Sequence, residues 1–185
     1  MCQHRRVIPR ATSIEFGRRL ARLAGRLLTG RDRATDHGRS ADPDHSGYPG
    51  DFTGPATAIR LEYAPHADGR PDCGEIVWAW VPYEEDHRQG KDRPVLVIGH
   101  DGGWLLALML TSTDHDHDTT VEVRRDHAGR VWMDIGTGPW DPRARPSEVR
   151  LDRILRLDPN TVRREGSALE RGLFEQVAKA LGRGW

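Results

Sequence analysis

Five consecutive residues, Asp114 to Asp118, alternate aspartate with histidine and could ligate a divalent metal ion. Imidazole nitrogens and carboxylate oxygens are common metal ligands. In a strand, however, His115 and His117 would lie on one face and the aspartates on the other. A polar loop of this composition is also typical of a solvated surface. We therefore expect no functional metal ion and no cofactor, and weak binding of an added metal remains an alternative.

A second group that could do chemistry is a set of arginines in the last loop and strand, namely Arg143, Arg145, Arg150, Arg153 and Arg156. Contacts to phosphate dominate the affinity of proteins for nucleic acids, so this set is a candidate track for RNA. The same arginines could instead pair with carboxylates of their own domain or with an acidic partner protein.

Tryptophans are a third such group, because their rings can stack on nucleic-acid bases. The candidates are Trp78, Trp80, Trp104, Trp132 and Trp140. At least three of them fall in strand patterns, which favours a place in the core.

Composition limits the classes of protein to which the chain can belong. Its 185 residues fit one domain, or one domain with a tail. No run approaches the roughly 18 apolar residues of a membrane span, and two cysteines, Cys2 and Cys73, are too few for a disulfide scaffold. With 28 basic and 28 acidic residues, charge alone does not indicate a nucleic-acid partner.

The first 57 residues differ from the rest. Residues 12–30 predict a basic amphipathic helix, and residues 31–57 are rich in Gly, Pro, Asp, His and Ser, which predicts a flexible linker. We therefore divide the chain into an Arg-rich N-terminal part, residues 1–57, and a folded domain, residues 58–185. The lack of a convincing export signal predicts a cytoplasmic protein without membrane association.

The folded part begins with short strands. A short strand at residues 59–63 is expected first. Alternating or continuous apolar residues then predict strands at 74–82, 93–99, 104–112, 119–125, 130–136 and 147–157. Asp158-Pro159 predicts the start of a helix that ends at Gly166, and Ser167 with Glu170 predicts a capping box for a second helix. The expected fold is α+β and mainly β: a small SH3-like antiparallel barrel with C-terminal helices.

The order of the motifs resembles the MazF/PemK family of toxin–antitoxin ribonucleases. The resemblance covers roughly residues 59–181. It is carried by Gly-Glu-Ile-Val-Trp at 74–78, Gln89-Gly90, Arg-Pro-Val-Leu-Val-Ile at 93–98, Leu-Thr-Ser at 110–112, and the final strand and helix. It implies a metal-independent endoribonuclease that cuts single-stranded RNA, including mRNA, at short sequences. It also implies a homodimer whose RNA groove is blocked by a cognate antitoxin.

The resemblance also implies site residues. The catalytic arginine of the family precedes the proline that opens its strand, which corresponds to Arg93, and the catalytic threonine corresponds to Thr111. Substrate-binding positions are expected at their neighbours, namely Gln89, Lys91, Ser112 and Thr113. A guanidinium is a planar fork of donors that matches phosphate and stays charged, so Arg93 would stabilise the transition state rather than act as a base. In the alternative interpretation, Arg93 pairs with Asp92 or Glu85 and Thr111 only ends a strand.

A general base is not identified by these motifs, although His87, His115 and His117 have a suitable ordinary pKa. The loop at residues 83–87 is more acidic than expected for a loop that grips RNA. Two other functions therefore stay open. One is a non-catalytic nucleic-acid-binding or regulatory protein of the same fold, and the other is an SH3-like module that binds peptides.

Overall fold

The computed structural model describes residues 47–112, 122–163 and 167–184. The expected N-terminal helix, the first part of the expected linker and the Asp114–Asp118 segment lie outside these ranges.

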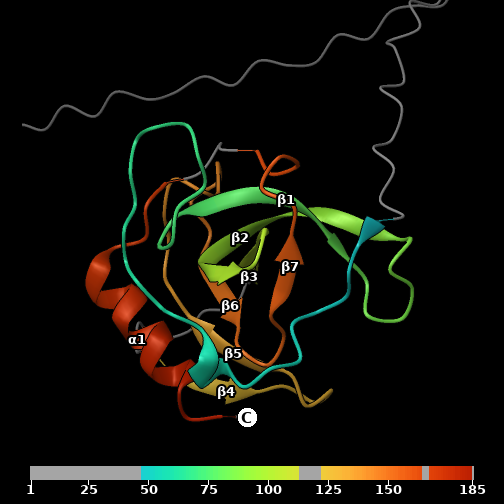
Figure 1. The fold of residues 1–185 in the computed structure, drawn as a ribbon. Helices are drawn as coiled ribbons and strands as arrows, with labels where there is room; N and C mark the ends of the chain where they lie inside the picture. Colours follow the sequence, from blue (N-terminus) through green and yellow to red (C-terminus); the bar gives the residue numbers. More distant parts are fainter. Residues whose placement is uncertain (1–46, 113–121, 164–166, 185) are drawn as a thin grey trace, which may run out of the picture. The chain divides into compact units, whose positions relative to one another are not determined.

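Seven antiparallel strands form one sheet (Figure 1). They are β1 (Ile76–Pro82), β2 (Gly90–Asp101), β3 (Trp104–Ser112), β4 (Val123–Arg125), β5 (Val131–Asp134), β6 (Ser147–Arg150) and β7 (Leu155–Leu157). Their order is β1-β2-β3-β6-β5-β4, with β7 also paired to β3. The expectation of a mainly β, antiparallel fold is confirmed.

The sheet is open, so the expectation of a closed barrel is wrong. β1 and β4 are its two ends, and no ladder joins them within the described residues. The outer edge of β1 is instead used by the segment before the C-terminal helix. The amide of Trp78 donates to the carbonyl of Arg163 at 2.8 Å, and the amide of Ile76 donates to the carbonyl of Ser167 at 2.9 Å. These bonds occupy the edge of β1 that would have to pair with β4 to close the sheet into a barrel.

Both faces of the central strands are buried, and alternate residues supply two apolar clusters. On one face, Ile76 and Leu96 pack with the C-terminal helix. On the other face, Val77 and Val95 pack with Leu155 of β7. Burial on both faces explains why the centre of β2 (residues 94–98) and most of β3 (residues 104–110) are continuous apolar runs rather than an alternation of apolar and polar residues.

The expected strand at 147–157 is divided into β6 and β7. Residues 151–154 form the break, and two bonds to β5 hold it. The amide of Leu151 donates to the carbonyl of Val131 at 2.8 Å, and the amide of Val131 donates to the Asp152 carboxylate at the same distance. A side chain that satisfies a backbone donor in this way competes with regular strand pairing.

One C-terminal helix is present, α1 (Arg171–Leu181). Its N-cap is Glu170, whose side chain accepts the amide of Leu173, rather than the predicted Ser167. The helix expected to begin at Asp158 is absent from residues 158–163. There, the carboxylate of Asp158 accepts the amide of Asn160 at 2.9 Å and its carbonyl accepts the amide of Thr161 at 3.0 Å, so a turn forms instead.

Residues 47–57, expected in a flexible linker, pack against the sheet. The amide of Phe52 donates to the carbonyl of Ile154 at 2.8 Å, and a short 3₁₀ helix, η2 (Ala56–Ala58), leads to the buried Ile59. The strand expected at 59–63 does not form. That segment is held by packing and by the Tyr63 hydroxyl, which donates to the carbonyl of Leu169 at 2.7 Å.

Candidate active site

Arg93 and Thr111 lie at corresponding positions on neighbouring strands. The last residue pair between β2 and β3 on this side is Val95 with Met109. Arg93 is two residues beyond Val95, and Thr111 is two residues beyond Met109. Since side chains alternate with a period of two, both point to the face that carries Val95 and Met109. Continued by two residues on each strand, the register would place on one face the two residues to which the resemblance gave catalytic roles.

The Arg93 guanidinium is not committed to a carboxylate of the described residues. Arg93 is half-buried, and its partner in the β1–β2 ladder is Ala79. Asp92, proposed above as an alternative partner, forms an ion pair with Arg163 instead. No ion pair joins Arg93 to Glu85 within the described ranges. The donors of Arg93 are thus available to a ligand in this part of the chain.

A buried carboxylate lies across the ladder from Thr111. Glu148 of β6 is paired with Thr111 and is 5% exposed. It accepts two hydrogen bonds from Arg124 of β4, at 2.8 and 2.6 Å, and this pairing raises the pKa of Arg124. Sequence reasoning missed this pair. The only signal was one glutamate within a short apolar strand pattern, and locating its partner requires the order of strands in the sheet.

The other predicted substrate-binding residues divide into different environments. Lys91 is exposed and shares the face of Arg93 by alternation. Gln89 is exposed, and its side-chain amide donates to Asp86 at 3.1 Å. Ser112 points to the opposite face, where its hydroxyl donates to the Asp141 carboxylate at 2.8 Å. Thr113 lies outside the described residues, as do His115 and His117.

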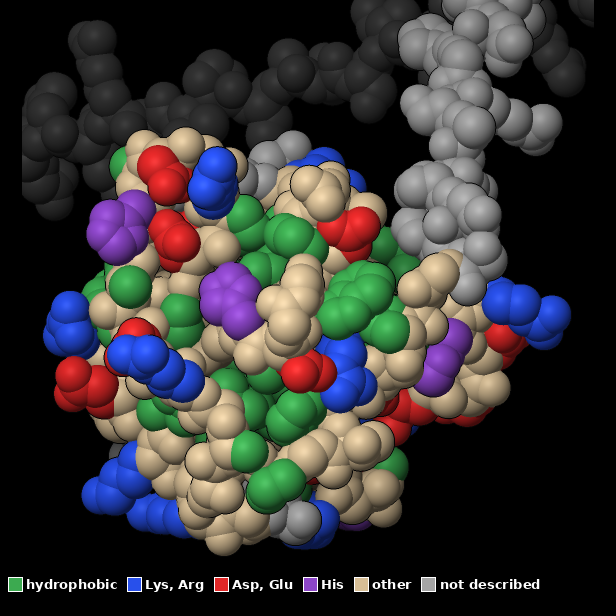
Figure 2. Space-filling model, viewed as in Figure 1, with side chains coloured by type: hydrophobic (Ala, Val, Ile, Leu, Met, Phe, Trp, Pro, Cys, Tyr) green, Lys and Arg blue, Asp and Glu red, His purple; other side chains and the backbone are tan. Residues whose placement is uncertain are grey.

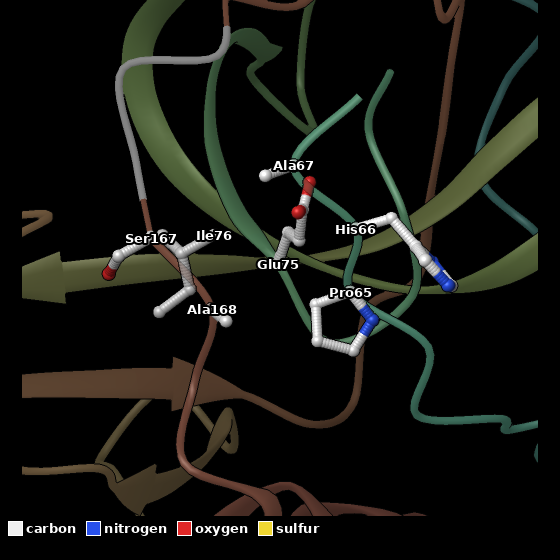
Figure 3. A pocket seen from close by; sticks show the side chains of 7 residues that line it. All are labelled: Pro65, His66, Ala67, Glu75, Ile76, Ser167 and Ala168. Carbon is white, nitrogen blue, oxygen red and sulfur yellow. The ribbon is translucent and has the colours of Figure 1, made fainter. Parts of the chain in front are cut away.

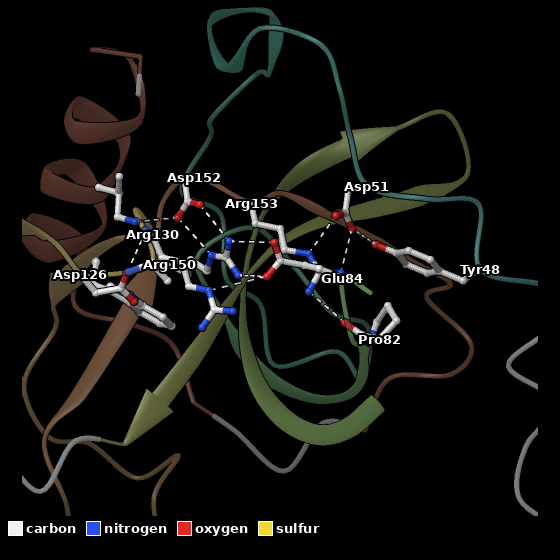
Figure 4. A network of polar contacts seen from close by, with 12 residues as sticks. Tyr48, Asp51, Pro82, Glu84, Asp126, Arg130, Arg150, Asp152 and Arg153 are labelled. Carbon is white, nitrogen blue, oxygen red and sulfur yellow. Dashed lines mark hydrogen bonds and ion pairs between the residues drawn. The ribbon is translucent and has the colours of Figure 1, made fainter. Parts of the chain in front are cut away.

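Four of the five arginines of the predicted RNA track pair with carboxylates of their own domain, which was the alternative expectation; two of them, Arg150 and Arg153, are drawn in Figure 4. Arg150 is paired with Glu84 at 2.5 Å and with Asp152 at 2.9 Å. Arg153 is paired with Asp51 at 2.8 Å, and Arg156 with Asp101 at 2.6 Å.

The two earlier arginines of the track differ from each other. Arg145 is paired with Asp141 at 2.9 Å. Arg143 is exposed, and its side chain has no ion pair within the described ranges. Of the five, only Arg143 is left free to meet a phosphate in this part of the chain.

The carboxylates around Arg150 have perturbed pKa values. The hydrogen bond from Arg150 lowers the pKa of Glu84, against the opposing effect of burial. Burial alone would raise the pKa of Asp152, but hydrogen bonds from Arg150 and from the Val131 amide lower it. Both groups are therefore held in their charged form in the folded protein.

This network predicts loss of stability in acid. A carboxyl whose pKa is lower in the folded state stabilises the fold above its ordinary pKa, and that contribution is lost as the pH falls through the lower value. We expect the free energy of unfolding to be nearly constant from about pH 7 to about pH 5 and to fall steeply below about pH 4. Urea unfolding across this range measures it, and Asp152→Asn should flatten the decline. A decline that begins above about pH 6 would instead implicate histidines.

The tryptophans are partly core and partly surface. Trp132 and Trp140 are buried, and their indole N–H groups donate to Asp126 and to Ser147, both at 3.0 Å. Trp78, Trp80 and Trp104 are half-exposed. Of the five candidates, these three are the ones with exposed surface, which a base would need for stacking.

Charges of both signs are interspersed on the surface. On the face seen in Figure 2, lysine and arginine side chains lie among aspartate, glutamate and apolar side chains. That face has no broad positive area. An anionic ligand there would be recognised by individual groups rather than by a field spread over the face.

A cavity of about 440 Å³ lies between residues 65–67, the start of β1 and the segment before α1 (Figure 3). It is lined by Pro65, His66, Ala67, Glu75, Ile76, Ser167 and Ala168. None of the predicted site residues lines it, so this cavity is separate from the predicted site.

Within the described ranges, no group of three or more His, Cys, Asp or Glu residues is arranged to hold a metal ion. The Asp114–Asp118 segment, which raised that possibility, is outside those ranges. Among the described residues, no helix has both the length and the apolar character needed to cross a membrane.

Comparison with known proteins identifies the family. A family model described as a PemK-like, MazF-like toxin of type II toxin–antitoxin systems matches residues 72–184, which is more than half of the chain. No curated protein matches the chain significantly. A solved structure of MazE-MazF (Form-II) from Deinococcus radiodurans is similar, with 20% identity and a TM-score of 0.39, over 63% of this chain and 96% of that chain. The chain therefore belongs to the PemK-like, MazF-like toxins of type II toxin–antitoxin systems, as the order of its motifs predicted.

Proposed function

We propose that this chain is a sequence-selective, metal-independent endoribonuclease that cleaves single-stranded RNA and acts as the toxin of a toxin–antitoxin pair. The support for the proposal is that the β2–β3 register, continued by two residues, puts Arg93 and Thr111 on one face of adjacent strands, in a chain that belongs to this toxin family. A cognate antitoxin and a second copy of the chain are the proposed protein partners, and cytoplasmic mRNA is the proposed substrate.

The proposed reaction needs donors directed at one phosphate. The ribose 2′-hydroxyl attacks the adjacent phosphorus and loses its proton, while the bond from phosphorus to the 5′-oxygen breaks and that oxygen gains a proton. The products are a 2′,3′-cyclic phosphate and a 5′-hydroxyl. Negative charge develops on the non-bridging oxygens, where the Arg93 guanidinium and the Thr111 hydroxyl would donate hydrogen bonds.

The acidic loop between β1 and β2 opposes RNA binding less than its sequence indicates. Glu84 is paired with the buried Arg150, and Asp86 accepts hydrogen bonds from Arg88 and Gln89. Pairing neutralises most of the repulsion that these carboxylates would exert on a phosphate. The loop is therefore compatible with RNA, which favours the enzyme over a peptide-binding module.

An assay on purified full-length protein tests the proposal. Mixed single-stranded RNA is incubated with the chain in the presence of EDTA, and the new ends are analysed. We expect fragments that carry 5′-hydroxyl ends and cluster at short recurring sequences. RNA that stays intact would contradict the enzyme. Retained RNA affinity without cleavage would then support the non-catalytic alternative.

A further inference from the structure

Residues 47–59, here called the N-terminal strap, precede the part of the chain that matches the family model but belong to the packed domain. Three kinds of contact hold the strap. The Phe52 amide donates a hydrogen bond to the carbonyl of Ile154, the side chain of Ile59 is buried, and the Arg156 guanidinium lies 5.2 Å from the centre of the Phe52 ring. The strap is therefore a candidate for a role that the family domain alone does not contain.

The strap supplies the counter-charge of a buried arginine. Arg153 has a side chain that is 6% exposed, and it donates to the Asp51 carboxylate from Nε at 2.8 Å and from Nη2 at 3.3 Å. Its remaining donor, Nη1, bonds the carbonyl of Pro82 at 2.9 Å (Figure 4). One guanidinium thus links the strap to the last residue of β1, where the β1–β2 loop begins.

A second contact joins the strap to the loop itself. The Tyr48 hydroxyl donates to Asp51, and the rings of Tyr48 and His87 meet in a T-shaped contact, with 5.1 Å between the ring centres. His87 is in the middle of the loop, which is closed by a bond of 2.8 Å from the Tyr83 amide to the carbonyl of Gln89. The strap therefore touches the middle of the loop directly, through Tyr48, and is linked to the beginning of the loop through Arg153.

We propose that Tyr48 and Asp51 are positioning residues that hold the β1–β2 loop, and with it Gln89 and Lys91, in the arrangement that engages RNA. The inference rests on the proposed function and extends it to residues outside the family domain. Neither residue touches the reacting atoms. They act through Arg153, because a buried guanidinium without its carboxylate must move toward water and release Pro82.

Asp51→Asn in the full-length chain is the test, since it removes the charge with little change in size. Glu62→Gln is the matched control, because Glu62 pairs with Arg60 on the exposed surface of the next segment. Hydrogen exchange is measured at the amides of residues 83–89 and of α1, and kcat and KM are measured for RNA cleavage. Tyr48→Phe is a milder second variant, which keeps the ring against His87.

We expect faster exchange in residues 83–89 of Asp51→Asn, unchanged exchange in α1, and a roughly 10–10²-fold loss of kcat/KM, the size expected for small displacements of binding groups. Glu62→Gln should match the unsubstituted chain. Unchanged exchange in the loop would overturn the inference, and so would faster exchange with unchanged cleavage. An unsubstituted chain that cleaves no RNA would contradict the proposed function, and the loop exchange would still test the contact between strap and loop.

Discussion

Replacing Arg93 with alanine is expected to slow RNA cleavage by about 10²–10³-fold, the usual cost of losing one donor aimed at developing charge. The fold should survive, because within the described residues the Arg93 side chain has no ion-pair partner whose loss would be destabilising. Single-turnover cleavage of a defined single-stranded RNA measures the rate, and the urea midpoint measures the stability.

Two further variants make the Arg93 result specific. Arg93→Lys keeps the charge but not the planar fork, so only part of the rate should return. Arg60→Ala removes an arginine that is paired with Glu62 on the exposed surface, and it should cleave at the normal rate. Normal cleavage by Arg93→Ala would remove Arg93 from the mechanism.

Replacing Arg150 with alanine is expected to lower the free energy of unfolding by about 3 kcal/mol, at the lower end of the cost of breaking a buried ion pair. Arg150 has a side chain that is 6% exposed and pairs with two carboxylates, Glu84 and Asp152. The lower end applies because these carboxylates are 40% and 22% exposed and can regain water. Urea unfolding at pH 7 measures the loss.

An exposed ion pair provides the comparison for Arg150. Arg88 has a side chain that is 86% exposed and is bonded to Asp86, so Arg88→Ala should lower the free energy of unfolding much less than Arg150→Ala does. Equal losses for Arg150→Ala and Arg88→Ala would mean that burial of the Arg150 network does not contribute to the fold.

The strands nearest the site could be predicted from local pattern alone. β1 is apolar throughout and β3 is apolar from Trp104 to Leu110, and the turn between β2 and β3 has glycine at residue 102, where φ is +59°. Such signals depend on residues close together in the chain. Local pattern did not identify Arg93 and Thr111 as site residues; the resemblance to the family did.

The features that sequence reasoning missed depend on distant residues. Composition made residues 47–57 look disordered, but Asp51 is ordered by Arg153, which lies 102 positions away in the chain. Arg150 and Arg156 looked like a surface for RNA until the fold supplied their carboxylates. The Glu148–Arg124 pair likewise requires the order β3-β6-β5-β4, which no local pattern contains.

The proposed cleavage depends most on a guanidinium and a hydroxyl that act on one phosphate. Cleavage rates of Arg93→Ala, Thr111→Val and the double variant test this, because groups that act as a unit give losses that do not multiply. We expect the double variant to be about as slow as Arg93→Ala alone. Losses that multiply would place the two groups at separate sites or steps and would contradict the account.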